Sequence, residues 1–109
     1  MPYNEILAQR ILAELGQFSG LVEKKMFGGT AFLVNGNMAC GVHKEDLIVR
    51  VGPASYEKAL AQAHTRPFDL TGRPMAGWVE VESAGYAADG DLKDWIRQGV
   101  AFALTLPAK

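Results

Sequence analysis

The chain has 109 residues, a length that fits one domain, residues 1–109, and leaves no room for two. Hydrophobic residues make up 49% of the sequence and charged residues 21%, which excludes a chain that is disordered throughout. The formal net charge is −1, from 11 basic and 12 acidic side chains. Nucleic-acid-binding proteins usually carry a basic excess that neutralises phosphates, and this chain lacks one.

The cysteine content and the N-terminus indicate the cellular compartment. Cys40 is the single cysteine, so no intrachain disulfide can form, which fits a reducing compartment. Residues 1–5 lack the basic segment that opens a signal peptide. No apolar run approaches the roughly 20 residues that cross a bilayer. We therefore expect a cytoplasmic protein without a membrane partner.

The first half of the chain predicts one helix followed by a strand meander. Apolar residues recur every fourth position over residues 3–15, with Asn4 at the start and Gly16 at the end. The Asn35-Gly36 pair lies between two apolar runs and predicts a tight hairpin, because both residues tolerate positive φ. The predicted strands are residues 22–27, 30–34, 38–42 and 47–51.

The second half predicts two more helices around short strands. A helix opens at Gly52-Pro53 and ends near Arg66-Pro67, since the residue before proline avoids the helical region. Short strands follow at 68–70 and 77–82, then a loop over 83–90. Asp89 or Asp91 is expected to cap a last helix that runs to about residue 105. In that helix we expect another backbone to pass close to Gly99, because glycine in a helix interior costs about 1 kcal/mol. One face of this helix is apolar: Leu92, Trp95, Ile96, Gly99, Val100 and Ala103.

The predicted order is therefore α-β-β-β-β-α-β-β-α, in an α+β fold. Short turns between successive strands imply an antiparallel sheet. The helices are expected to cover one face of this sheet in a two-layer sandwich and to leave the other face wet or available for contact. An exposed face or edge also favours a homodimer.

Several motifs, in this order, resemble the TfoX N-terminal domain family, and the similarity covers nearly the whole chain. The most specific of them is Met-Phe-Gly-Gly. The matching segments are Lys25-Met26-Phe27-Gly28-Gly29, Phe32-Leu33-Val34-Asn35-Gly36-Asn37-Met38, Leu47-Ile48-Val49-Arg50, Pro67-Phe68, Gly72-Arg73-Pro74-Met75, Trp78-Val79-Glu80-Val81 and Leu92-Lys93-Asp94-Trp95-Ile96.

This resemblance implies a binding or regulatory module. The family is named for regulators of natural competence, which are thought to act with the cAMP receptor protein and which carry a second, C-terminal domain. The similar fold is that of type III secretion chaperones, which bind other proteins and often form dimers. We therefore expect a standalone domain that binds a protein partner.

The predicted binding residues are Met26, Phe27, Gly28, Gly29 and Arg73. The first four could form a corner at which Phe27 is offered to a partner. In the alternative, Phe27 is part of the core and the glycines only permit a sharp bend. Arg73 lies in a turn at a family position, and loop residues reach partners more often than core residues do.

Catalytic and metal chemistry find little support in the sequence. Cys40 and His43 are an odd number of residues apart, so on a strand they point to opposite faces. Cys40 is expected to be a small core residue, and His43 is expected to be solvated at a turn. Glu80 and Glu82 share a face, which we expect to be the wet one. His64 is expected to end the second helix, near the negative end of its dipole. One cysteine and two histidines without ligand spacing predict no metal site and no cofactor.

Three hypotheses follow. The favoured one is a non-catalytic binding module that acts through a protein partner. The second is a small enzyme whose site gathers distant residues such as Glu80, His43 and Arg73. The third is direct DNA binding through Lys24, Lys25, Arg50, Arg66 and Arg73, which we expect instead to be scattered solvated charges.

Overall fold

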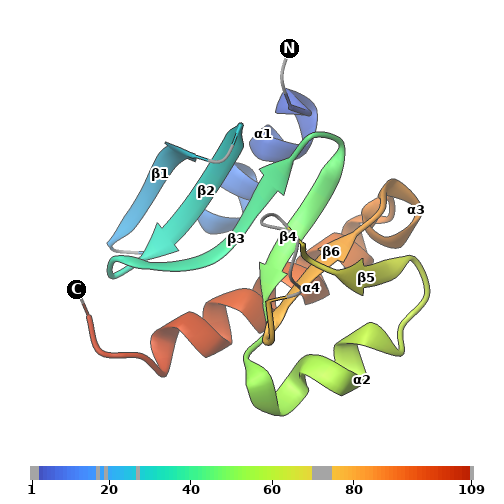
Figure 1. Ribbon diagram of the computed structural model, residues 1–109. Coiled ribbons are helices and arrows are strands. Elements are labelled where there is room, and N and C mark those ends of the chain that lie inside the picture. Colours follow the sequence, from blue (N-terminus) through green and yellow to red (C-terminus); the bar gives the residue numbers. More distant parts are fainter. Residues whose placement is uncertain (1–2, 17, 19, 27, 70–74, 109) are drawn as a thin grey trace.

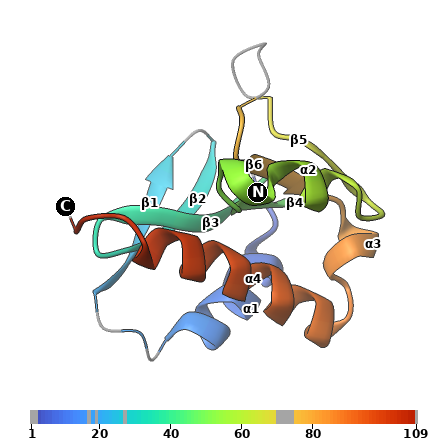
Figure 2. The same cartoon turned by 90° about the horizontal axis from the view of Figure 1, so that it is seen from below.

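The computed structural model describes residues 3–16, 18, 20–26, 28–69 and 75–108. A six-stranded antiparallel sheet of order β1-β2-β3-β4-β6-β5 carries α1 and α4 side by side on one face (Figures 1 and 2). The elements are α1 (Glu5–Leu15), β1 (Leu21–Met26), β2 (Gly29–Val34), β3 (Asn37–His43), β4 (Asp46–Arg50), the 3-10 turn η1 (Pro53–Ser55), α2 (Tyr56–Leu60), β5 (Thr65–Pro67), β6 (Trp78–Val81), α3 (Ser83–Tyr86) and α4 (Asp89–Leu104). The α+β class and the order of the principal elements are confirmed.

The start of α1 follows from its capping residue. The side-chain Oδ1 of Asn4 accepts a hydrogen bond of 3.0 Å from the backbone N–H of Leu7, which satisfies one of the free donors of the first turn. Leu7, Ile11 and Leu15 are buried, as the four-residue spacing predicts. This cap and this stripe place α1 against the sheet.

The hairpin between β2 and β3 has the predicted turn and an unpredicted bulge. Asn35 and Gly36 both have positive φ, 54° and 83°. Phe32 pairs with Cys40 whereas Leu33 pairs with Met38, so Ala39 is an extra residue in β3. The bulge aims the Ala39 carbonyl at Gly99 of α4, where a Cβ would collide with it. The close backbone approach predicted for Gly99 is confirmed.

The main core lies between the sheet and the helices. Every residue of the predicted apolar face of α4 is buried. It packs on inward-facing strand residues, among them Phe32, Cys40, Leu47, Val49 and Val79. Burial of this apolar area is the dominant stabilising contribution to the fold.

A second apolar cluster covers part of the opposite face, which corrects the expectation of a wet surface there. Ala31, Met38, Ile48 and Phe68 are buried on this side. Partly buried Leu33, Met75 and Trp78 pack against them. The chain on either side of residues 70–74 therefore acts as a partial cover for the outer face of the sheet.

Four predictions about element boundaries are wrong. The second helix ends at Leu60, and the fifth strand is Thr65–Pro67 rather than 68–70, because His64 turns the chain at a φ of 62°. Pro67 then lies in an edge strand, the one kind of strand that tolerates a missing N–H. Residues 83–86 form α3 within the predicted loop, and the N-cap of α4 is Ala88 rather than Asp89 or Asp91.

Candidate functional site

The predicted glycine corner is explained by backbone geometry. Gly29 is buried in β2, and a Cβ on it would clash with the carbonyl oxygen of Val42 in β3. Gly28 has a φ of 75° with no neighbouring atom within 4 Å of a hypothetical Cβ, so it serves the bend. Met26 ends β1, while its side chain, Phe27 and Arg73 lie outside the described residues. A binding role for this corner stays a prediction.

The single cysteine cannot act as a nucleophile in this fold. Cys40 is fully buried on the helix side of the sheet, and this burial raises its pKa to about 12. At neutral pH the thiolate that performs nucleophilic attack is absent. The prediction that Cys40 is a small core residue is confirmed.

His43 is not the solvated turn residue that we expected. It is the last residue of β3 and is half-buried, with its ring edge-on to that of Phe68 at a centroid distance of 5.9 Å. Burial lowers the pKa of His43 below its ordinary value, with Lys44 acting in the same direction. The imidazole therefore belongs to the rim of the second apolar cluster.

A cluster of charges surrounds Arg66 on the outer face. The guanidinium of this β5 residue lies 2.6 Å from an oxygen of Asp46 and 3.1 Å from one of Glu80, and it also pairs with Glu82. The strand order β4-β6-β5 brings the three carboxylates together. One arginine thus links the edge strand to two neighbouring strands.

Glu80 is the most perturbed acid of this cluster. Its side chain is only 13% exposed, so the expectation that it faces water is wrong. Burial, together with a hydrogen bond to Asp46, raises its pKa to about 7, against the opposing effect of Arg66. A carboxyl with this pKa can exchange a proton near neutral pH, although ion-pair networks of purely structural role produce the same shift. Sequence reasoning missed this cluster because it placed the fifth strand at residues 68–70. Arg66 lies beside these acids only when β5 spans Thr65–Pro67.

Arg50 and Lys25, two other residues of the predicted basic set, do not join Arg66 in a single patch. The Arg50 guanidinium lies between the Trp78 and Phe102 rings, 5.1 and 5.3 Å from their centroids. Lys25 lies over the ring of Tyr3, 4.5 Å from its centroid, and hydrogen-bonds to its hydroxyl. Each of these cations, like Arg66, has its own local partner.

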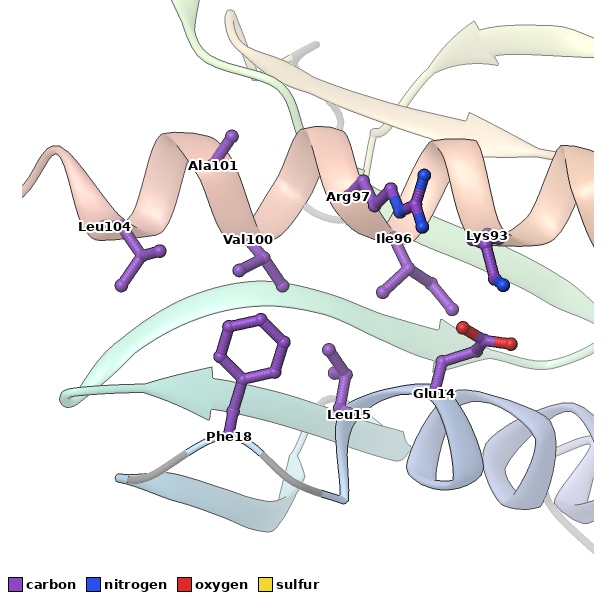
Figure 3. Close-up of a pocket in the computed structure, with 9 residues that line it drawn as sticks. All are labelled: Glu14, Leu15, Phe18, Lys93, Ile96, Arg97, Val100, Ala101 and Leu104. Atoms are coloured by element: carbon purple, nitrogen blue, oxygen red, sulfur yellow. The ribbon is translucent and has the colours of Figure 1, made fainter.

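A groove lies between α1 and α4. Its cavity of about 430 Å³ has an apolar end, where Phe18 is 42% exposed and Leu104 is 52% exposed (Figure 3). Glu14, Lys93 and Arg97 lie at the other end. The apolar lining comprises Leu15, Phe18, Ile96, Val100 and Leu104. Sequence reasoning missed this groove because it could not place Phe18, which follows the end of α1, beside α4.

A second hollow extends the first along the same two helices. Its cavity of about 380 Å³ lies between Arg10 and Ala13 of α1 and the first turns of α4. Glu14 and Lys93 line both hollows, so the two adjoin. Arg10 is held at its far end by Asp89, at 2.9 Å, and by two backbone carbonyls. The groove therefore has an apolar end, a cationic middle and an ion-paired far end.

Within the described ranges, no group of three or more His, Cys, Asp or Glu side chains is placed to hold a metal ion. None of the helices in the described part of the chain is long and apolar enough to cross a membrane.

Comparison with known proteins assigns the family. Searches of curated proteins and of solved structures found no match to this chain. The family model for the TfoX N-terminal domain matches residues 11–103, which include all six strands and the core face of α4. The chain therefore belongs to the TfoX N-terminal domain family.

Proposed function

We propose that the protein is a non-catalytic binding module that acts in gene regulation through a protein partner, which it contacts at the groove between α1 and α4. The observation that carries the proposal is the exposure of Phe18 and Leu104 on either side of an apolar hollow. Large apolar side chains gathered around a concave surface are typical of protein interaction sites. Membership of a family named for competence regulators supports a regulatory role.

The state of the reactive side chains favours binding over catalysis. Cys40 is buried with a raised pKa, and Arg66 is saturated by carboxylates. The groove itself contains neither histidine nor cysteine among the residues described there. The side chains of the groove are therefore suited to contact with another protein surface rather than to catalysis.

A capture experiment with matched variants tests this function. The tagged protein is immobilised at near-native concentration in extract of its own host, beside a Phe18→Ala/Leu104→Ala variant and an Ile6→Ala control. Ile6 is 72% exposed on α1 but lies outside the groove lining described above. We expect wild type and control to retain one specific protein and the double variant to lose it. Recovery of background alone by the wild type would remove the proposal.

The predicted corner provides a competing location for the same function. A Phe27→Ala variant and an Arg73→Ala variant are carried through the same capture. If they lose the partner while the groove variant keeps it, the contact lies at residues 26–29 and 73, as the sequence first indicated. We expect the reverse result.

The proposal also includes a cytoplasmic location and a homodimeric state. Both edges of the sheet carry features that discourage strand pairing: Glu23, Lys24 and Lys25 on β1, and Pro67 on β5. A dimer would therefore form through side-chain contacts rather than through a continuous sheet. Light scattering across a concentration series measures the mass directly.

A small enzyme is the second candidate, favoured by the pKa of about 7 at Glu80 beside Arg66 and Asp46. His43 pairs with Asp46 across β3 and β4, so part of the group named from the sequence does share one face. Ligand-observed NMR with a library of small polar metabolites tests this candidate. A binder lost in Glu80→Gln but kept in Leu104→Ala would establish the site, and the absence of such a binder would leave the cluster as an ion-pair network.

A further inference from the structure

We propose that the groove between α1 and α4 receives an amphipathic helix of the partner, with apolar residues over Phe18 and Leu104 and an acidic residue facing Lys93 and Arg97. The inference rests on the proposed function, and it specifies the kind of partner segment that the groove binds. Three features of the groove carry it: the nature of its walls, its length and the order of its charges.

The walls of the groove select a helix over an extended segment. Both walls are helices, whose backbone groups are already paired within α1 and α4 apart from their end turns. An extended peptide binds by adding its own N–H and C=O groups to an open sheet edge, and the groove offers none. A helical segment arrives with its backbone hydrogen bonds made, and needs only side-chain contacts from the groove.

The length of the groove suits a helix of three to four turns. The two hollows follow α4 from Gly90 to Leu104, and the 16 residues of this helix rise about 24 Å. Val100 and Leu104 lie four residues apart on the α4 wall, while Glu14 of α1 and Phe18, beyond the end of α1, line the other wall. Side chains at this spacing form ridges between which a third helix can pack.

The charges of the groove fix the chemistry of the partner. Lys93 and Arg97 form no ion pair with any residue that the structure describes, and Lys93 points toward the carboxylate of Glu14 (Figure 3). At the far end, Arg10 is already neutralised by Asp89. The middle of the groove is thus left with a net positive charge, which an acidic side chain complements.

The position of the acid relative to the apolar anchors also follows. Arg97 lies about two helical turns from Leu104 along α4. A helix that lies along the groove therefore needs its Asp or Glu about two turns from the residues that contact Phe18 and Leu104. This spacing distinguishes the proposed ligand from a generally sticky apolar peptide.

Photo-crosslinking in the native host locates the bound segment. A photoreactive amino acid replaces one of three exposed alanines: Ala101 at the apolar end, Ala13 at the polar end, or Ala61 after α2 as the control. We expect Ala101 and Ala13 to crosslink to one segment of one other protein, with apolar residues at helical spacing near Ala101 and an acidic residue about two turns away. Ala61 should give no such product.

The remaining outcomes are decisive. Crosslinks to a second copy of this chain, to a small amphipathic anion, or to a segment without helical apolar spacing would overturn the inference. A partner that is captured in the pull-down but crosslinked only from Ala61 would preserve the binding of a protein partner and refute the groove as its location. Failure of both capture and crosslinking would refute both.

Charge reversal then tests the acidic contact. The crosslinked segment, as a synthetic peptide, is titrated by fluorescence anisotropy against wild type, Lys93→Glu, Arg97→Glu and the control Lys58→Glu on α2. We expect roughly tenfold weaker binding for each groove variant and unchanged binding for the control. A peptide with its acid changed to lysine should regain affinity for Arg97→Glu. Equal binding by all four proteins would contradict the proposal.

Discussion

Gly99 shows how one residue sets the distance between the helix layer and the sheet. Glycine within a helix costs about 1 kcal/mol relative to alanine. In this fold the residue lies against the carbonyl of Ala39, which the bulge in β3 pushes toward α4. The absence of a side chain lets α4 approach, and this places Leu104 and Arg97 beside α1.

Gly99→Ala should therefore destabilise the protein despite the better helix propensity of alanine. We expect a loss of about 1–3 kcal/mol, because the added methyl group meets backbone that cannot rotate away. Gly90→Ala is the matched control in the same helix, since no atom lies within 4 Å of its hypothetical Cβ. It should be neutral or stabilising by up to about 1 kcal/mol. Urea unfolding followed by circular dichroism measures both; equal effects would contradict the packing argument.

Glu80 carries a prediction about pH. Its pKa of about 7 in the folded protein exceeds the ordinary value of 4.5, so the native state holds a proton that the unfolded chain has released. Its contribution to stability is complete below pH 4.5 and is lost as pH rises through about 7. The unfolding free energy of wild type relative to Glu80→Gln should fall over this window.

Carbon-detected NMR of the side-chain carboxyls checks the titration directly, with Glu80→Gln assigning the resonance. A midpoint near 7 is expected. A midpoint near 4.5 would show that Arg66 outweighs burial at this site.

Among the elements, β5 depends most on side-chain contacts for its position. It has three residues and pairs only with β6. Arg66 adds contacts to Asp46 on β4 and to Glu80 and Glu82 on or beside β6. The arginine therefore strengthens an edge that backbone pairing alone holds weakly.

Arg66→Gln should lower stability by roughly 1–2 kcal/mol at low salt and by less in 0.5 M NaCl. Exposed ion pairs contribute up to about 1 kcal/mol each and are screened by salt. The control is Arg97→Gln, an exposed arginine with no ion pair among the described residues, for which a change within about 0.5 kcal/mol is expected. Hydrogen exchange at Thr65 shows whether β5 itself is loosened.

Elements with strong local signals could be predicted from the sequence, and those fixed by distant contacts could not. Asn35-Gly36 encodes its turn locally, and the face of α4 follows from its periodicity. The end of α2 depends instead on the pairing of Thr65 and Arg66 with β6, which local propensity does not report. The groove could not be predicted for the same reason. It forms where residues near position 18 contact residues near position 100, which are distant in the sequence.

At the scale of the whole molecule, the distribution of charge argues against nucleic acid as a direct ligand. The net charge is −1, and Lys25, Arg50 and Arg66 have separate local partners. Phosphate binding requires several cations on one surface. The groove has three cations, Arg10, Lys93 and Arg97, and they lie beside the carboxylates of Glu14 and Asp89.

We therefore expect no electrophoretic mobility shift with duplex DNA at 50 mM salt and micromolar protein. Low salt strengthens every phosphate contact, so a negative result there is informative. A shift that disappears in Lys93→Glu/Arg97→Glu would contradict our assignment and make the groove a nucleic-acid site.

The two apolar clusters on opposite faces of the sheet each contain one of the two tryptophans of the chain: Trp95 in the main core and Trp78 in the outer cluster. Replacing either with phenylalanine leaves a single tryptophan, whose emission reports on one side of the sheet. Emission from Trp95 would follow α4 during partner binding, while emission from Trp78 would follow the cover of the opposite side. The two tryptophans can therefore show whether partner binding on one face of the sheet changes the environment of the other face.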